Sequence, residues 1–235
     1  MKHLRSVCLA GLIIGAAAML AACGVSRADA STYVQGELDA VYRGVYNEDY
    51  LELVEDMTKA DAEEKYKSNV SAEAEYLLYY FLGVEYPDDA VTAKAESLIK
   101  EIYSHAKYTV GEADKLQSGD FMVEVTLSPI EIMPLLAEET YSEHWQAACM
   151  EKGITTQEEL NNVSEEEYAA IDAVYAMAML EEVEALLPQL SYGEDQAIML
   201  QLELGEDNYY SMVEEDWQYL DSVMIDYYGD YPAAG

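Results

Sequence analysis

The sequence predicts an α+β fold: a helix-rich single domain in which a small antiparallel sheet packs against helices. Apolar residues recur at the spacing of amphipathic helices over most of 32–106 and 131–190. They alternate with polar residues, as in strands with one buried face, in two hairpins at about 107–128 and 195–212. Because a lone hairpin is marginally stable in water, we expect the two hairpins to join in one sheet covered by helices.

Four helices are expected before the first hairpin. Thr32 and Gln35 have the spacing of a capping box, and the helical period follows them. Three further helices are expected to begin near residues 47, 61 and 88. Gly83 and Pro87 separate the last two, because both residue types disfavour a continuing helix.

The first hairpin consists of residues 107–110 and 121–127, with turn residues at 117–120. Phe, Val and Leu occupy every second position of its second strand, which ends before Pro129. This alternation predicts a strand with one face in the core.

A helical block then separates the hairpins. Thr155 with Glu158, and Ser164 with Glu167, have capping-box spacing and predict the starts of two helices. The second hairpin is expected to join residues 198–204 to 209–212 through the turn residues Gly-Glu-Asp-Asn. A closing helix is expected from about 214 to 227.

The N-terminal segment has the pattern of a secretory signal. Lys2 and Arg5 precede an almost wholly apolar run over residues 6–20, and the first acid is Asp29. The run is shorter than the roughly 20 residues that a membrane-spanning helix needs. A cleaved signal peptide is therefore favoured over an uncleaved membrane helix.

The end of this segment predicts a lipid anchor. Leu20, Ala21 and Ala22 are expected to form the signal peptidase recognition site, and Cys23 directly follows them. The Cys23 thiol would receive a diacylglyceryl lipid, whose two acyl chains hold more durably than one. The alternative is an ordinary signal peptide with a chance cysteine.

These patterns predict a protein on the outer face of the bacterial cytoplasmic membrane, attached by its lipid. The expected organisation is a lipoprotein signal peptide (1–22), a lipidated Cys and tether (23–31), an α+β extracytoplasmic domain (32–228) with a helical insertion (131–190), and a loose tail (229–235).

The chain is strongly acidic, with 12 basic and 47 acidic residues. Residues 1–22 contain two basic and no acidic side chains, so the mature chain would carry a net charge of −37. This charge argues against nucleic acid and anionic headgroups as partners, and it favours cations or basic partners. A solvated, soluble surface is the alternative explanation.

No catalytic, metal or cofactor site can be assigned from the sequence. Removal of residues 1–22 and lipidation of Cys23 leave Cys149 alone, so no disulfide is expected. His144 and Cys149 are separated by about 140° around a helix, which argues against a nucleophile–base pair. The sequence contains no CxxC, HExxH or EF-hand motif.

Tyrosine is unusually frequent, with 21 Tyr against 2 Phe. A ring with a hydroxyl suits half-buried surfaces and interfaces, and it can stack on sugars or receive cationic groups. The candidate binding surface is the C-terminal aromatic group: Tyr209, Tyr210, Trp217, Tyr227 and Tyr228. The alternative is that Tyr replaces Phe at the margins of the core.

Three features together resemble a known group of proteins. They are the lipobox, the run Val41-Tyr-Arg-Gly-Val-Tyr-Asn-Glu-Asp-Tyr50, and the strand ending Val125-Thr-Leu-Ser-Pro129. These features resemble uncharacterised lipoproteins of low-GC Gram-positive bacteria that carry a domain of unknown function. The resemblance spans most of the mature chain and implies a location and a fold. It implies no catalytic residues.

The first functional hypothesis is a non-enzymatic binding module whose partner is an envelope protein, a cationic peptide or a glycan. The alternative is a cell-envelope hydrolase that uses paired carboxylates. A transporter-associated solute-binding lipoprotein is less favoured. Two hinged lobes usually need more than the 213 residues left after cleavage, and the sequence contains no duplicated α/β halves.

Overall fold

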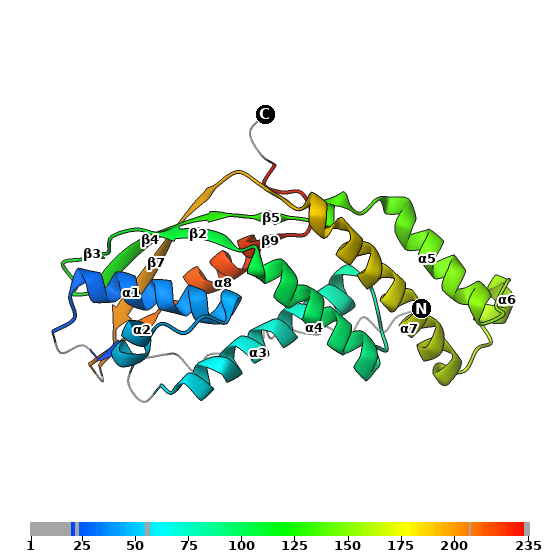
Figure 1. Ribbon diagram of the computed structural model, residues 1–235, viewed down its shortest axis with the longest axis horizontal. Coiled ribbons are helices and arrows are strands. Elements are labelled where there is room, and N and C mark those ends of the chain that lie inside the picture. Colours follow the sequence, from blue (N-terminus) through cyan, green and yellow to red (C-terminus); the bar gives the residue numbers. More distant parts are fainter. Residues whose placement is uncertain (1–19, 22–23, 55–56, 207, 233–235) are drawn as a thin grey trace.

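The computed structural model describes residues 20–21, 24–54, 57–206 and 208–232. Figure 1 shows the sheet on one side of the molecule, the N-terminal helices beneath it, and a helical hairpin that extends along the longest axis. This α+β arrangement, with a small antiparallel sheet packed against helices, confirms the predicted fold class.

The first helix begins earlier than expected. α1 (Arg27–Leu38) has Ser26 as its N-cap: the Ser26 hydroxyl accepts the Asp29 amide, and the Asp29 carboxylate accepts the Ser26 amide. The predicted start at Thr32 is therefore wrong, and the expected tether over 23–31 ends before Arg27. The helix continues as a π-helical turn, η1 (Asp39–Arg43), which ends at Gly44 in the left-handed region.

The next helices follow the predicted order. They are α2 (Glu48–Leu53), α3 (Lys59–Glu75) with the π-helical turn η2 (Tyr76–Phe81), and α4 (Asp89–Ser104). Asn47, Thr58 and Asp88 cap them, each by accepting a backbone N–H with its side chain. The predicted starts at residues 47, 61 and 88 agree with these caps to within three residues.

The two predicted hairpins join in one antiparallel sheet. Its strand order is β1 (Leu20–Ala21), β8 (Tyr209–Met212), β7 (Gln196–Leu204), β4 (Phe121–Ser128) and β2 (Lys107–Val110), and β3 (Asp114–Lys115) also pairs with β4. The β4–β7 pairing places Val123 opposite Leu200 and Val125 opposite Ile198, all buried. The alternation read from the sequence is thus the inner face of the sheet, against which α1 and α8 (Glu214–Met224) pack.

The block between the hairpins forms a projecting helical hairpin. It consists of the 3-10 turn η3 (Met133–Leu135), α5 (Glu138–Glu151), α6 (Gln157–Leu160), α7 (Glu165–Leu186) and the 3-10 turn η4 (Leu187–Gln189). Ser164 and Glu167 form the predicted capping box of α7. The other box consists of Thr156 and Glu159, one residue later than the expected Thr155 and Glu158.

A second, small sheet was not expected. It has the order β6 (Ser191–Tyr192), β5 (Ile130–Glu131), β9 (Ile225–Asp226), and β5 is parallel to β9. The closing helix therefore ends at Met224 rather than near residue 227. The Asp226 carboxylate accepts the amides of residues 228–231, so this part of the expected loose tail is held in place. Residues 233–235 lie outside the described residues.

Several tyrosines lie in the core. Tyr33, Tyr42, Tyr50 and Tyr103 are among the largest fully buried side chains, together with Phe121. The Tyr50 hydroxyl donates to Glu37 and that of Tyr42 to Asp221, so burial leaves these polar groups bonded. Among the helices that the structure describes, none is long and apolar enough to span a membrane.

Candidate functional site

Aromatic rings from distant parts of the chain meet at η2. Tyr76 stacks on Tyr80 at 5.5 Å between ring centroids and meets Tyr227 edge-on at 5.0 Å. Phe81 lies 5.0 Å from Tyr227 and 6.1 Å from Tyr228. Tyr80 and Tyr228 are 57% and 65% exposed, so this group of rings reaches the surface.

The local helix geometry explains this grouping. The π-helical turn of η2 inserts a residue into the helix, an irregularity that often occurs at functional sites. Leu77 and Leu78 enter the core, whereas Tyr79 and Tyr80 face outward. The turn thus presents consecutive aromatic residues at the surface without loss of core packing.

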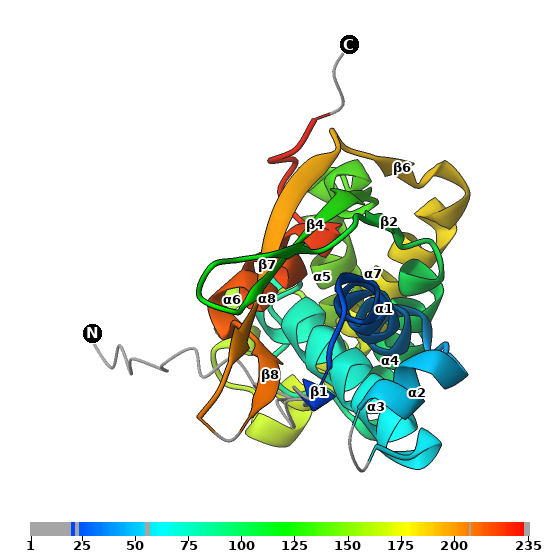
Figure 2. The same cartoon turned by 90° about the vertical axis from the view of Figure 1, so that its left-hand side faces the viewer.

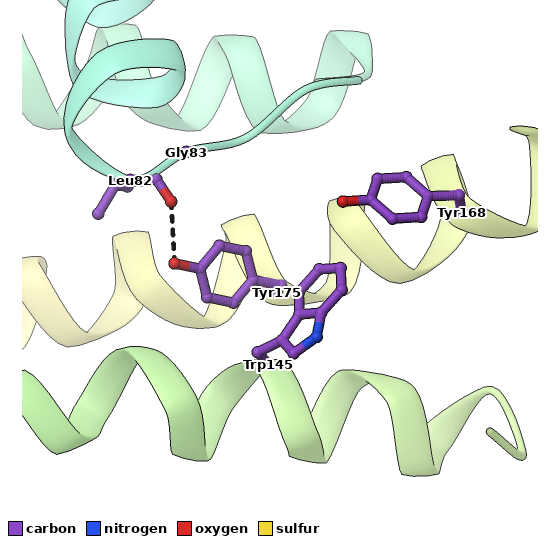
Figure 3. A pocket seen from close by; sticks show the side chains of 5 residues that line it. All are labelled: Leu82, Gly83, Trp145, Tyr168 and Tyr175. Atoms are coloured by element: carbon purple, nitrogen blue, oxygen red, sulfur yellow. Dashed lines mark hydrogen bonds between the residues drawn. The ribbon is translucent and has the colours of Figure 1, made fainter. Parts of the chain in front are cut away.

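A second group of rings lines a shallow hollow of about 220 Å³ between α5, α7 and the turn at Leu82 and Gly83. Figure 3 shows Trp145 from α5 beside Tyr175 and Tyr168 from α7. Trp145 lies 5.5 Å from Tyr175 and 5.7 Å from Tyr168. The Tyr175 hydroxyl donates to the Leu82 carbonyl at 2.9 Å, which ties the turn to α7.

The two groups of rings are connected through Tyr141. Tyr141 lies 6.2 Å from Phe81, and it also neighbours Tyr175, whose pKa is raised to about 12, first by burial and then by Tyr141 and Asp172. At the far end Tyr86 contacts Tyr168 at 6.0 Å. We call this connected set of rings the aromatic band; Tyr175 and Tyr227 are buried and the other members are half-buried or exposed. The band consists of Tyr76, Tyr80, Phe81, Tyr86, Tyr141, Trp145, Tyr168, Tyr175, Tyr227 and Tyr228.

Carboxylates flank the aromatic band. Asp172 is 1% exposed and accepts the amides of Glu85 and Tyr86 at 2.7 Å each, which fixes the loop that carries Tyr86. The pKa of Tyr168 is raised, mainly by burial and further by the charges of Glu85 and Asp172. Negative charge beside aromatic faces favours apolar ligand surfaces that carry cationic groups.

A pair of carboxylates lies under one end of the aromatic band. Glu73 on α3 accepts the Tyr227 hydroxyl at 2.6 Å and a second hydrogen bond from Tyr103. Asp221 on α8 accepts the Tyr42 hydroxyl at 2.7 Å. Tyr227 is a member of the aromatic band and also donates to Glu73, so this carboxylate helps to hold one ring of the band in place.

Burial dominates the electrostatics of this pair. It raises the pKa of Glu73 to about 7, and the charge of Asp221 adds to the rise, while hydrogen bonds from Tyr227 and Tyr103 oppose it. Burial also raises the pKa of Asp221, against the hydrogen bond from Tyr42. Glu73 as a residue is partly exposed, but its carboxylate end is enclosed by tyrosines. Near neutral pH the pair can therefore hold a proton.

The structure separates the C-terminal residues that the sequence grouped together. Tyr227 and Tyr228 lie in the aromatic band. Tyr209 and Tyr210 lie on β8, where Tyr210 is buried against Phe121 and donates to the Gly119 carbonyl. Trp217 stacks on Tyr42 at 5.9 Å.

The lipobox is only partly within the described chain. Leu20 and Ala21 form β1, whereas Ala22 and Cys23 lie outside the described residues. Cys149 is buried and unbridged, and its pKa is raised by burial. Within the residues that the structure describes, no group of three or more His, Cys, Asp or Glu side chains could hold a metal ion.

Sequence reasoning missed most of the aromatic band. Tyr168 and Tyr175 have the seven-residue spacing of one helix face, which indicated core packing. The same spacing equally permits two rings that line a hollow. Whether the two tyrosines pack in the core or line a hollow depends on Trp145, and only the packing of α5 against α7 brings Trp145 to these tyrosines.

Comparisons with known proteins support the fold. No family model matches the chain, and no curated protein matches it. A solved structure that is similar is that of a candidate lipoprotein from Bacillus subtilis, ycdA, with a TM-score of 0.51 and 14% identity. The match covers 84% of this chain and 56% of the other, so the chain spans little more than half of the length of its structural neighbour. At this identity the likeness is one of fold.

Proposed function

We propose that the protein is a lipid-anchored extracytoplasmic lipoprotein that acts as a non-enzymatic binding module, with the aromatic band as its binding surface. The lipobox and the fold shared with a candidate lipoprotein support the anchor. The observation that carries the binding function is the continuity of the band, which joins rings from η2, α5, α7 and the segment after β9.

The position of the aromatic band suits a surface receptor. Three residues, 24–26, separate Cys23 from α1, so the lipid would hold the α1 end of the domain close to the membrane. Figure 1 shows the start of α1 at one end of the longest axis and the α5–α7 hairpin at the other. The hollow of the aromatic band would thus face away from the membrane.

The chemistry of the aromatic band favours an elongated ligand. Rings that are exposed or half-buried offer successive stacking faces, and the flanking carboxylates favour cationic groups. A glycan strand or a cationic peptide of an envelope partner meets both conditions. Nucleic acid does not, because the mature chain would carry a net charge of −37.

Binding is tested with lipidated protein captured from detergent-solubilised membranes. A double variant, Trp145→Ala with Tyr168→Ala, is expected to lose its co-purified protein or glycan partners. Tyr219→Ala, which removes a 51% exposed ring on α8, is the matched control and should retain them. Equal capture by all three proteins would exclude the aromatic band as the binding surface.

The anchor is tested separately by metabolic labelling with an alkyne palmitate. Wild type is expected to incorporate the label and Cys23→Ala to lose it. Equal labelling of the two proteins would refute lipidation at Cys23.

A second candidate function is a cell-envelope hydrolase that uses Glu73 and Asp221. The observation in its favour is that burial, with the charge of Asp221, raises the pKa of Glu73 to about 7, since two acids with different pKa values can divide into a general acid and a base. In that case Glu73→Gln would abolish hydrolysis of glycan or peptide fragments from the envelope. A binding module would keep its partner in the same variant.

A further inference from the structure

Leu20 lies between β8 and Val54, and we call the position that it fills the slot. It pairs antiparallel with Tyr210 of β8 on one side and forms an antiparallel bridge with Val54 on the other. Its side chain is only 1% exposed and belongs to the hydrophobic core, whereas Ala21, opposite Tyr209, is exposed. Figure 2 shows β1 beside β8 at the edge of the sheet.

This occupant belongs to the segment that maturation would remove. Cleavage before Cys23 takes Leu20 and Ala21 away from the domain. β8 then becomes the edge of the sheet, and backbone groups beside Tyr210 and Val54 lose their partners. Buried backbone groups are nearly always paired, and an open edge is a template for another strand. The buried apolar site that the Leu20 side chain fills becomes empty at the same time.

We propose that the slot between β8 and Val54 is a docking site, in the mature protein, for an extended segment of a partner protein. This inference rests on the proposed function, because it requires removal of residues 1–22. The partner segment adds a strand antiparallel to β8, and one of its aliphatic side chains, of the size of leucine, fills the buried site that Leu20 occupied. This is strand addition at a sheet edge, in which the backbone supplies pairing and one pocket supplies selectivity.

Leu20 and Ala21, which fill the slot in this structure, indicate the chemistry of the partner segment. A strand fits because the slot is bounded by backbone on two sides, at Tyr210 and at Val54. A small residue suits the next position, because Ala21 lies opposite Tyr209. The acidity of the domain favours basic residues on either side of the aliphatic anchor.

The location of the slot indicates where the partner segment lies. Leu20, which fills the slot in this structure, precedes Cys23 closely in the sequence, and α1 begins at Arg27 soon after it, so the slot lies beside the end of the domain that carries the lipid. The docked strand is therefore held close to the membrane surface. An extended juxtamembrane segment of an integral membrane protein fits this position, and this site is separate from the aromatic band on η2, α5 and α7.

The test uses a peptide that carries Ala18-Met-Leu-Ala-Ala22 between pairs of lysines, and a control peptide of the same charge with glycine in place of leucine. Binding is measured by fluorescence anisotropy to mature lipidated protein in detergent, with mass spectrometry to establish cleavage and lipidation. Hydrogen exchange reports on the backbone amides of residues 209–212. The uncleaved Cys23→Ser protein, whose own leader fills the slot, is the matched protein control.

The expected result is saturable binding of the leucine peptide to the mature protein, at least tenfold weaker binding of the glycine peptide, and protection of the β8 amides. The Cys23→Ser protein should bind neither peptide. Equal binding of the two peptides, binding to both proteins, or a mature dimer that excludes the peptide would overturn the proposal. If mass spectrometry shows that wild type retains residues 1–22, the proposed lipoprotein function fails. If the protein is cleaved but does not bind the leucine peptide, only the docking proposal fails.

Discussion

Replacement of Glu73 by Gln should make the protein more stable at alkaline pH than wild type. Burial raises the pKa of Glu73 from its ordinary value of 4.5 to about 7, so the folded state holds this proton more tightly than the unfolded state. The wild-type domain therefore has no penalty from Glu73 below pH 4.5 and loses stability as the pH rises towards 7. Glutamine keeps the shape of the side chain and does not titrate.

The size of the effect follows from the two pKa values. At about 1.4 kcal/mol per pH unit, the interval from 4.5 to about 7 corresponds to roughly 3 kcal/mol. Partial exposure of the residue reduces this through solvent screening, so we expect about 1–3 kcal/mol between pH 4.5 and pH 8. Asp221 also has a raised pKa, so the titration belongs to the pair, and Asp221→Asn should reduce the same pH dependence.

The assay is urea unfolding of wild type, Glu73→Gln and Glu75→Gln at several values of pH between 4.5 and 8. Glu75 lies on the same helix but is exposed, so its variant controls for removal of one negative charge from a very acidic protein. The free energy of unfolding of wild type minus that of Glu73→Gln should fall as the pH rises. Parallel stability curves for wild type and Glu73→Gln would show that the carboxylate is not held in the buried, tyrosine-lined position described.

Three further substitutions test the site and the core. Tyr175→Phe should cost about 1 kcal/mol, since it removes the hydroxyl that donates to the Leu82 carbonyl, whereas Tyr168→Phe should cost less; thermal unfolding measures both. Gly36→Ala, usually favourable in a helix, should destabilise the domain by more than about 2 kcal/mol, because the new Cβ would lie 2.2 Å from the Tyr50 ring. An unchanged midpoint in urea for Gly36→Ala would contradict the described α1–α2 packing.

The fold was predictable where the pattern is local and repeated. Alternation over residues 121–127 and 198–204 identified β4 and β7, and hydrophobic burial then favoured their pairing. The parallel pairing of β5 and β9 could not be foreseen, because two-residue strands have no period. The start of α1 was missed because its capping box, Ser26 with Asp29, has the shorter Asp side chain at the third helical position in place of the usual Glu or Gln.

The candidate site was less predictable than the fold, since its members are far apart in the chain. Phe81 meets Tyr141 and Tyr227 only after the α5–α7 hairpin and the C-terminal segment have folded onto η2. Glu73 and Asp221 could not be selected from 47 acidic residues without the burial that distinguishes them. Composition indicated a role for tyrosine, but only tertiary contacts show which tyrosines form a surface.

The abundance of tyrosine and the abundance of acid have a common structural explanation. With 12 basic residues against 47 acidic ones, most carboxylates cannot be paired with a cation. Tyrosine hydroxyls donate to carboxylates at 2.6–2.8 Å in the pairs Tyr42–Asp221, Tyr50–Glu37, Tyr108–Asp39 and Tyr227–Glu73. Glu37 and Asp39 also pair with Lys65 and Arg43, whereas among the described residues Asp221 and Glu73 have tyrosine donors and no cation. A phenylalanine in place of Tyr42 would fill the same volume and leave the Asp221 carboxylate without its donor, which costs more than the lost hydrogen bond itself. These four tyrosines, Tyr227 of the aromatic band included, are therefore explained by the core, and the proposed binding function uses the exposed and half-buried rings of the band.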